Sequence, residues 1–403
     1  MKRILFVDDE PMVLDAIQRM LRPLRVEWQM DFLRGGAEAL RFMEQTPVDV
    51  VVSDMLMPGM SGAQFLKEVM LRYPQTVRII LSGHADQELI MQCVGTTHQY
   101  LAKPCDAEVL KRTLRRAALL GNSLPNDAVK KLTARMDRLP TVPVLYTQMI
   151  KTLQSPDASL EDVALIVQRD PGMTAKMLKL VNSAYFGLSQ SITSPAEALS
   201  FLGMETVKSL VLSLHVFSQY ETAQSGGVFV TEVWNHSLRT AEGARIIAGQ
   251  EDLPDRQLEE AFVCGLLHDT GKIVLAYNCS MNYSKTCRLA TAENISLLEA
   301  ERRVFSCTHA DVGGYLLGLW GLPVPVVESL TFHHAPAMSL NERFSTLAAV
   351  HVANVLAHEA DKSAGSRASA PLDHEYLEKL GLAGRVNAWR EALQQLRAPD
   401  RKP

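Results

Sequence analysis

The stretch that decides the fold, residues 48–62, reads VDVVVSDMLMPGMSG. Its run of valines is typical of a strand buried on both faces, as strands of parallel sheets are. The run ends in a carboxylate, Asp54, and a Pro-Gly loop follows. Because open α/β sheets bind ligands at the carboxyl ends of their strands, Asp54 lies where such a fold carries its chemistry. The simpler alternative is that Asp54 only caps the following turn.

Three further apolar runs, at residues 4–7, 78–81 and 100–102, also end in polar side chains, which are Asp8 and Asp9, Ser82, and Lys103. Amphipathic segments separate the runs, so the pattern predicts an α/β fold with a doubly wound parallel sheet. The carboxyl ends of parallel strands meet at one edge, where these acids, the hydroxyl and the ammonium should converge. Such a set suits transfer of a phosphoryl group to Asp54, with Mg²⁺ on the carboxylates and Lys103 offsetting phosphoryl charge.

On these residues, residues 1 to about 120 resemble the receiver domain of two-component response regulators, which has a flavodoxin-like fold. The matching positions are Asp8-Asp9, Asp54 with Met57-Pro58-Gly59 and Gly62, Ser82-Gly83, and Lys103-Pro104. The resemblance implies that Asp54 accepts a phosphoryl group from a sensor histidine kinase. It further implies Mg²⁺ held by Asp8, Asp9 and Asp54, Lys103 as the phosphate partner, and Ser82 and Tyr100 as the switch hydroxyl and switch aromatic.

Composition narrows the class of protein. The 403 residues predict two or three domains, and 41 basic against 45 acidic residues leave a net charge of −4 without a basic footprint for nucleic acid. No apolar run approaches the roughly 18 residues of a membrane span, and Met1-Lys2-Arg3 leads straight into the first apolar run instead of a signal peptide. The six cysteines form no Cys-x-x-Cys pair. We therefore expect a cytoplasmic protein that binds neither membrane nor nucleic acid directly.

After a predicted linker at residues 121–130 the sequence pattern changes, and signals for one helix after another follow. Ser159, Asp170 with Pro171, and Ser194 with Pro195 are expected helix starts, and Gly203 is an expected helix end. An apolar stretch at residues 262–267 should form a helix that Gly271 ends. We expect an all-helical domain at 131–340 and a C-terminal helical extension at 341–403, with a flexible segment near 362–371.

The second domain contains several characteristic short sequence motifs, which are LPTVP at 139–143, RDPGM at 169–173, VNSAYFG at 181–187 and WGLP at 320–323. Together they resemble the HDOD domain, a signalling relative of the HD phosphohydrolases. The resemblance implies an all-α fold and an output through protein contacts, with a downstream signalling protein that the sequence does not name. A homodimer is a further possible partner arrangement.

This domain also carries a set of side chains suited to metal ligation, namely His236, His268, Asp269, His309, His333 and His334. Imidazoles and a carboxylate suit manganese, iron or zinc, and the set could hold one or two ions. By resemblance, the first three match ligands of HD hydrolases. The other three match the additional histidines of the HD-GYP cyclic-dinucleotide phosphodiesterases, and Lys272 matches the lysine after their His-Asp pair.

Two departures from that pattern bear on activity. The terminal Asp of those hydrolases would fall near Asn354, and the Gly-Tyr-Pro loop is absent. The sequence therefore favours a non-enzymatic response regulator, phosphorylated on Asp54, whose histidines are a vestigial cluster or a structural metal site. The first alternative is a phosphorylation-regulated, metal-dependent phosphodiesterase acting on a cyclic dinucleotide. The second alternative is a transcription factor, but the sequence contains no helix-turn-helix motif with a basic recognition helix.

Overall fold

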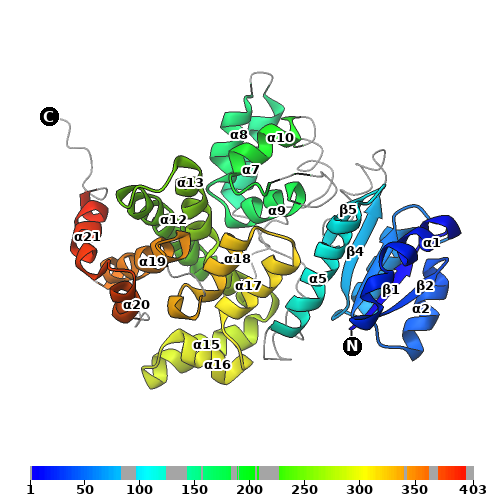
Figure 1. Ribbon diagram of the computed structural model, residues 1–403. Helices are drawn as coiled ribbons and strands as arrows, with labels where there is room; N and C mark the ends of the chain where they lie inside the picture. Colours follow the sequence, from blue (N-terminus) through cyan, green and yellow to red (C-terminus); the bar gives the residue numbers. More distant parts are fainter. Residues whose placement is uncertain are drawn as a thin grey trace.

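The computed structural model describes residues 2–82, 97–123, 143–155, 158–182, 188, 190–204, 207, 227–339, 343–362 and 371–395. An N-terminal α/β part is followed by a helical part, and Figure 1 shows helix α5 lying between the sheet and the helices that follow. The expected fold class, a parallel α/β domain followed by helices, is confirmed.

Five parallel strands form the sheet in the order β2-β1-β3-β4-β5. They are β1 (Lys2–Val7), β2 (Trp28–Leu33), β3 (Val50–Asp54), β4 (Val77–Ser82) and β5 (Gln99–Ala102). We did not predict β2, although Trp28, Met30 and Phe32 alternate with polar residues as edge strands do. The pairing of Asp54 with Leu81 and of Ser82 with Ala102 places the strand ends of β3, β4 and β5 side by side.

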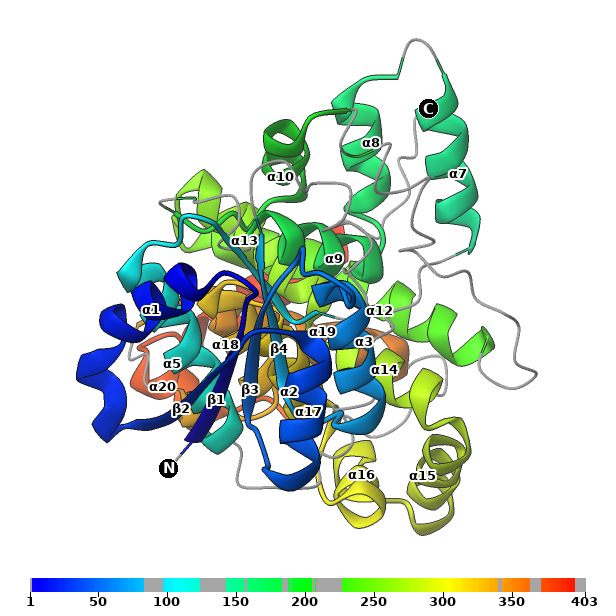
Figure 2. The same cartoon turned by 90° about the vertical axis from the view of Figure 1, so that its right-hand side faces the viewer.

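Helices cover both faces of the sheet, as Figure 2 shows, with α1 and α5 on one face and α2 and α3 on the other. Their bounds, with the short helix η1, are α1 (Pro11–Met20), η1 (Arg22–Val26), α2 (Gly36–Gln45), α3 (Gly62–Arg72) and α5 (Ala107–Ser123). Helix α5 continues into the first residues of the predicted linker. The rest of that linker, and the amphipathic segment at 88–94 that separates the third and fourth apolar runs, lie outside the described residues.

The start of α3 explains a glycine next to the strand end. Ser61 caps this helix by accepting a hydrogen bond from the backbone of Gln64, whose side chain bonds back to Ser61. A methyl group at Gly62 would collide with the backbone carbonyl oxygen of Asp54. The loop after β3 is therefore held directly against the aspartate.

The described residues from 143 onward form helices and no strand. The first group is α7 (Pro143–Gln154), α8 (Leu160–Val167), α9 (Pro171–Val181), α10 (Pro195–Leu202), α12 (Gly227–Gln250), α13 (Asp255–Leu267) and α14 (Thr270–Asn278). The second is α15 (Ser280–Glu293), α16 (Leu297–Phe305), α17 (His309–Leu319), α18 (Val324–Phe332), η2 (Pro336–Met338), α19 (Thr346–Lys362), α20 (His374–Lys379), η3 (Ala383–Arg385) and α21 (Val386–Gln395). The predicted caps at Ser159, Asp170 and Ser194 and the helix end at Gly203 are confirmed.

Gly271 does not end a helix, which corrects our expectation. Helix α13 already ends at Leu267, and Gly271 lies in the first turn of α14. Its role is steric, because a methyl group there would collide with the carbonyl oxygen of His309 at the start of α17. A close helix–helix approach, which sequence alone does not reveal, requires this glycine.

The C-terminal extension is helical, as expected, and closes the helical part with α20 and α21. Trp389 is fully buried, and its indole donates a hydrogen bond of 3.0 Å to Glu251, which follows α12. The flexible segment expected near 362–371 falls almost wholly outside the described residues. Among the helices that are described, none is both long and apolar enough to cross a membrane.

The sheet and the helical part meet at the start of β5. The buried Lys179 of α9 donates a hydrogen bond of 2.7 Å to the carbonyl oxygen of Thr97. Beside it, His98 is buried, and its Nδ1 accepts a hydrogen bond from the backbone N–H of Arg78. Burial, with the charges of Arg78 and Lys179, lowers the pKa of His98 well below 6.5.

We expect His98 to destabilise the fold in acid. The unfolded chain takes up a proton near pH 6.5, whereas the folded chain resists it, so stability present above pH 6.5 is lost as pH falls below that value. His98→Asn should flatten the dependence of the unfolding free energy on pH between 7 and 5, by up to about 1.4 kcal/mol per pH unit. Denaturant titrations at each pH measure this. His374→Asn, at an exposed position on α20, is the matched control, and an unchanged slope in His98→Asn would refute the assignment.

Candidate functional site

The first candidate site lies at the carboxyl edge of the sheet. Asp8 follows β1, Asp54 ends β3, Ser82 ends β4 and Lys103 follows β5. The Lys103 ammonium lies 2.7 Å from Asp8 Oδ2 and also forms an ion pair with Asp54. The other oxygen of Asp54 accepts a hydrogen bond of 2.8 Å from the backbone N–H of Leu56. The structure thus brings together the acids and the ammonium that the sequence singled out.

The electrostatics of this edge follow from burial and pairing. Burial raises the pKa of Asp54, and the hydrogen bond and charge of Lys103 offset only part of that effect. Burial opposes the charge of Lys103, but its bonds to Asp54 and Asp8 raise its pKa overall. Lys103 therefore remains an ammonium between two carboxylates. A phosphoryl group on Asp54 would meet this positive charge at once.

The remaining predicted residues of this edge are placed as follows. Asp9 is half-buried beside Asp8, so three carboxylates from two neighbouring strands are gathered at the edge, a hard-oxygen set that fits Mg²⁺. Ser82 is fully buried at the end of β4, and its carbonyl oxygen accepts a hydrogen bond from the Lys103 backbone. Tyr100 is fully buried on β5, within the same apolar cluster as Phe65 of α3.

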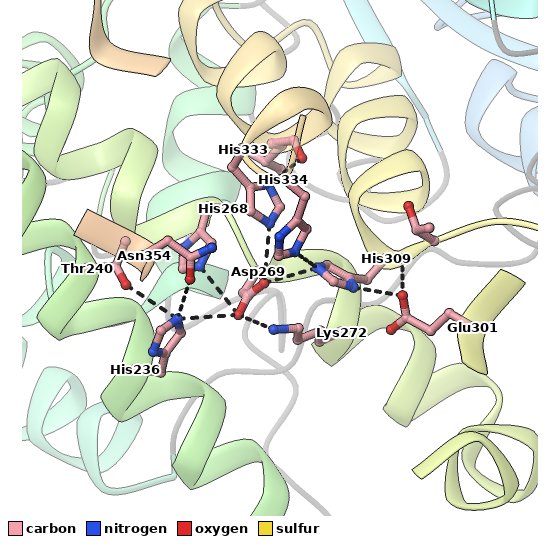
Figure 3. Close-up of polar contacts among 12 residues, drawn as sticks. His236, Thr240, His268, Asp269, Lys272, Glu301, His309, His333, His334 and Asn354 are labelled. Carbon is pink, nitrogen blue, oxygen red and sulfur yellow. Dashed lines mark hydrogen bonds and ion pairs between the residues drawn. The ribbon is translucent and has the colours of Figure 1, made fainter. Parts of the chain in front are cut away.

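The second candidate site is buried in the helical part, and Figure 3 shows that it unites side chains distant in the sequence. It draws on α12, the corner between α13 and α14, the start of α17 and the residues after α18, which supply His236, His268, Asp269, His309, His333 and His334. They form two groups that could each hold an ion, Asp269 with His309, His333 and His334, and Asp269 with His236 and His268. The predicted set is thus brought together around one carboxylate.

Asp269 presents one oxygen to each group. Its Oδ1 lies 3.2 Å from Nε2 of His309 and 3.7 Å from Nε2 of His333. Its Oδ2 lies 3.4 Å from Nε2 of His268 and 3.9 Å from Nε2 of His236. In this arrangement one carboxylate could bridge two ions.

Hydrogen bonds to backbone carbonyls orient two of the rings. Nδ1 of His268 lies 2.6 Å from the carbonyl oxygen of Gly265, and Nδ1 of His333 lies 2.9 Å from that of Leu330. Since a carbonyl oxygen only accepts, each Nδ1 carries the proton and each Nε2 keeps a free lone pair. Both Nε2 atoms and Oδ1 of Asp269 are buried without a hydrogen-bond partner among the described residues. Buried acceptors of this kind fit a metal ion.

The protonation of the cluster also suits a metal. Burial, with the charges of neighbouring groups, lowers the pKa of His236, His333 and His334 well below 6.5. Burial alone would raise the pKa of Asp269, but His268 and Lys272 hold it well below 3.8. Neutral imidazoles are the form that binds divalent cations. His309 differs, because burial opposes its charge but Glu301 and Asp269 raise its pKa overall, so a metal ion would compete with a proton at this ring.

The two groups differ in quality. His309 Nε2 and His334 Nε2 lie 3.1 Å apart, close to the separation of about 3.3 Å for two nitrogens on one tetrahedral zinc. In the other group, the Lys272 ammonium lies 2.6 Å from Asp269 Oδ2, and Asn354 Oδ1 lies 2.9 Å from His236 Nε2. The amide thus takes the place expected for it beside His236. We infer that the group of His309, His333 and His334 is the stronger metal site.

Two residues of this site were not predicted. Glu301 of α16 is fully buried, and its Oε2 accepts hydrogen bonds of 2.8 Å from both the backbone N–H and Nδ1 of His309. His358 stacks on His236 with ring centroids 3.9 Å apart, and burial, with Lys272 nearby, lowers the pKa of His358 to about 3. Glu301 lies in an amphipathic helix without any motif, so sequence offers no signal for it. His358 could have been found, because it lies one helical turn after Asn354 on α19.

Comparisons with known proteins agree with this two-part structure. The family model of the response regulator receiver domain matches residues 4–115, and that of the HDOD domain matches residues 139–336. An uncharacterized protein of Treponema pallidum is 27% identical over 230 residues, 55% of this chain and 44% of that protein. The hydrogenase transcriptional regulatory protein HoxA of Cupriavidus necator is 38% identical over 116 residues, 28% of this chain and 23% of HoxA.

The chain is also similar to a solved structure, the MmoQ response regulator of Methylococcus capsulatus. The alignment covers 65% of this chain and 98% of the MmoQ chain, with 25% identity and a TM-score of 0.49. The alignments span less than half the length of the two curated relatives above.

We expect Glu301 to control metal affinity through His309. Glu301→Gln removes the charge that orients and strengthens this ligand, so the affinity for Zn²⁺ should fall about 10- to 100-fold. Competition with a chromophoric chelator measures the dissociation constant. Glu378→Gln, exposed on α20, is the matched control and should bind like the parent protein. Equal affinities in the two variants would show that Glu301 is not a positioning residue.

Proposed function

The chain joins a response regulator receiver domain to an HDOD domain, and we propose that it is a response regulator phosphorylated on Asp54 by a sensor histidine kinase. The observation that carries the proposal is the convergence of Asp8, Asp54 and Lys103 at one edge of the sheet. Receiver domains in general take their phosphoryl group from a cognate kinase.

The residues suggest how the transfer proceeds. The Asp54 carboxylate attacks the phosphorus of the donor phosphohistidine, so that a P–O bond forms and the P–N bond breaks. Asp8, Asp9 and Asp54 would hold Mg²⁺, which supplies positive charge to the phosphoryl oxygens when bound. Lys103, now paired with Asp8 and Asp54, pairs with a phosphoryl oxygen in the product.

The output that we propose is a protein contact of the HDOD domain, with a downstream signalling protein or a second copy of the chain. The histidine cluster would hold manganese, iron or zinc without turning over cyclic dinucleotides. Two observations support this. Lys272 already neutralises Asp269 Oδ2, and Asn354 is a neutral amide where a second anchoring carboxylate would be expected. Two-ion hydrolysis needs both ions and an open position for water, and this half of the cluster disfavours the second ion.

A phosphodiesterase remains the second candidate, because Asp269 faces both ligand groups with one oxygen each. Such a carboxylate could bridge two ions around a hydroxide. The candidate requires that Lys272 leave Asp269 when the second ion binds. Metal loading followed by an activity measurement therefore separates the two functions.

We expect Asp54 to be the site of phosphorylation. Acetyl phosphate with Mg²⁺ should label the parent protein, and Asp54→Asn should lose the label because an amide is not a competent nucleophile. Intact-protein mass spectrometry measures the gain of one phosphoryl group. Asp49→Asn, a carboxylate at the amino end of β3 that pairs with Lys2, is the control and should label normally. Undiminished labelling of Asp54→Asn would contradict the assignment.

We expect no useful turnover of cyclic-di-GMP. The protein loaded with Mn²⁺, Fe²⁺ or Zn²⁺ should leave the dinucleotide intact with and without acetyl phosphate, and chromatography of the nucleotides measures this. Asn354→Asp tests the reason, because it restores the carboxylate and should strengthen binding of a second ion. Turnover by the parent protein that disappears in His268→Ala would instead establish the phosphodiesterase.

A further inference from the structure

Helix α17 connects the histidine cluster to the receiver domain. Its first residue, His309, lies 3.2 Å from the Asp269 carboxylate. The carbonyl oxygen of its last residue, Leu319, accepts a hydrogen bond of 3.0 Å from the side chain of Gln99 on β5. Eleven residues, about 16 Å of helix, thus separate a candidate metal ligand from the sheet of the receiver. Figure 1 shows α17 next to α5, on the side that faces the sheet.

The receiver end of this helix is held by buried polar contacts. The Lys179 ammonium bonds to the carbonyl oxygen of Thr97 at 2.7 Å and lies 4.6 Å from the centre of the Trp320 ring. Trp320 directly follows α17, so Lys179 contacts both Thr97 and the end of that helix. Gln99 makes a direct hydrogen bond to the same helix end. Lys179 and Gln99 are both buried, and separating the surfaces would leave buried polar groups to be rehydrated or left unpaired.

The metal end is fixed by glycines. A methyl group at Gly271 of α14 would collide with the carbonyl oxygen of His309, and one at Gly314 of α17 would collide with the Thr331 hydroxyl of α18. Helices α14, α17 and α18 are therefore packed without space for even one carbon. Asp269 directly precedes the first of these helices, and His333 directly follows the last. Their ligands should move together with α17.

The other ligands belong to a second pair of closely packed helices. A methyl group at Gly265 of α13 would lie 2.7 Å from the backbone of Ala241 on α12, so these two helices are also in close contact. They carry His236 and His268. Asp269 lies at the corner between α13 and α14 and so belongs to both packed groups, which also touch where α13 packs on α18. A small shift of α17 would change the distances across Asp269 rather than those within either group.

In the receiver, strand β5 lies between the contact with α17 and the carboxylates around Asp54. This strand has only four residues, with Gln99 at its amino end, bonded to Leu319, and Lys103 directly after its carboxyl end, bonded to Asp8 and Asp54. A phosphoryl group on Asp54 would give Lys103 a new partner at the carboxyl end of β5. Gln99 lies on this short strand, only four residues before Lys103, so a shift of that strand end would bear on its bond to Leu319.

We propose that α17 couples the two sites, so that a phosphoryl group on Asp54 and a divalent metal at the histidine cluster change each other's affinity through the contacts of Gln99 and Lys179. The inference rests on the proposed function, in which Asp54 is phosphorylated and the cluster holds metal. Coupling of binding free energies is reciprocal, so metal at the cluster would in turn report on the receiver. The HDOD domain would then supply an input to the receiver as well as its output.

The full-length protein allows a direct test. Its Zn²⁺ affinity is measured by chelator competition at constant Mg²⁺, with and without beryllofluoride, which mimics a phosphoryl group on a carboxylate. Zn²⁺ bound by His333→Ala, which lacks a ligand of the stronger group, corrects under the same conditions for binding outside the cluster. We expect beryllofluoride to change the affinity about fivefold or more, within the usual range of allosteric coupling. Asp54→Asn should show no such change.

Two substitutions test the route. Gln99→Ala and Lys179→Met should still bind Zn²⁺ and still accept label from acetyl phosphate, but beryllofluoride should no longer change their Zn²⁺ affinity. The matched controls are Gln29→Ala, exposed on β2 at the opposite edge of the sheet, and Lys285→Met, exposed on α15. Both controls should keep the full effect. Circular dichroism verifies the fold of each variant, and the measurement on the parent protein stands if one fails to fold.

The outcomes separate this inference from the function beneath it. Zn²⁺ binding that is equal with and without beryllofluoride, in a protein that labels on Asp54, would overturn the coupling and leave the proposed function intact. Coupling that persists in both Gln99→Ala and Lys179→Met would overturn the route through α17. Absence of any Zn²⁺ binding that depends on His333 would overturn the metal site itself, and the coupling with it.

Discussion

The buried carboxylate of Asp269 lies where four segments of the helical domain come together. A carboxylate that is almost fully removed from water costs several kcal/mol unless charges and hydrogen-bond donors surround it. Lys272 supplies a charge at 2.6 Å, and rings from four separate segments of chain converge on the two oxygens. The helices that carry these rings must therefore pack around one point, and glycines at their crossings permit that approach.

The two candidate sites of the chain share one electrostatic device. In the receiver, Lys103 lies between Asp8 and Asp54, and in the helical domain Lys272 lies against Asp269. In each case an ammonium compensates buried carboxylate charge where a divalent cation would add more positive charge. Binding of a cation or a phosphoryl group must then redistribute these ion pairs. Such a redistribution is a local event that a stiff strand or helix can carry further.

The contact between the domains gives this redistribution a path. Gln99 bonds the start of β5 directly to the end of α17, and Lys179 bonds to Thr97 while its ammonium lies over the Trp320 ring. Apolar residues of α5 and α17 also belong to one continuous core. The receiver is consequently not a tethered module beside the helices. Its last strand and last helix are part of the surface on which the helical domain packs.

The sequence by itself determined what is local in the chain. Strand runs that end in polar residues predicted four strands of the sheet and the convergence around Asp54, and cap residues such as Ser159 and Asp170 predicted helix starts, because these signals act over a few neighbouring residues. The His268-Asp269 pair and the four further histidines that the sequence singled out lie together in the folded chain. The edge strand β2 was missed because its alternation is short, and Gly271 was misread because its role is contact with another helix.

Only the tertiary structure decided which groups face each other across long separations. Glu301 orients His309, His358 stacks on His236, and Lys179 reaches Thr97, although none of these pairs shares a sequence motif. Packing sets these contacts, and packing depends on helix crossings that a linear pattern does not encode. Residue types in the sequence thus indicated the chemistry of each site. The residues that orient the ligands, and the contacts that join the helical domain to the receiver, are set only by the folded chain.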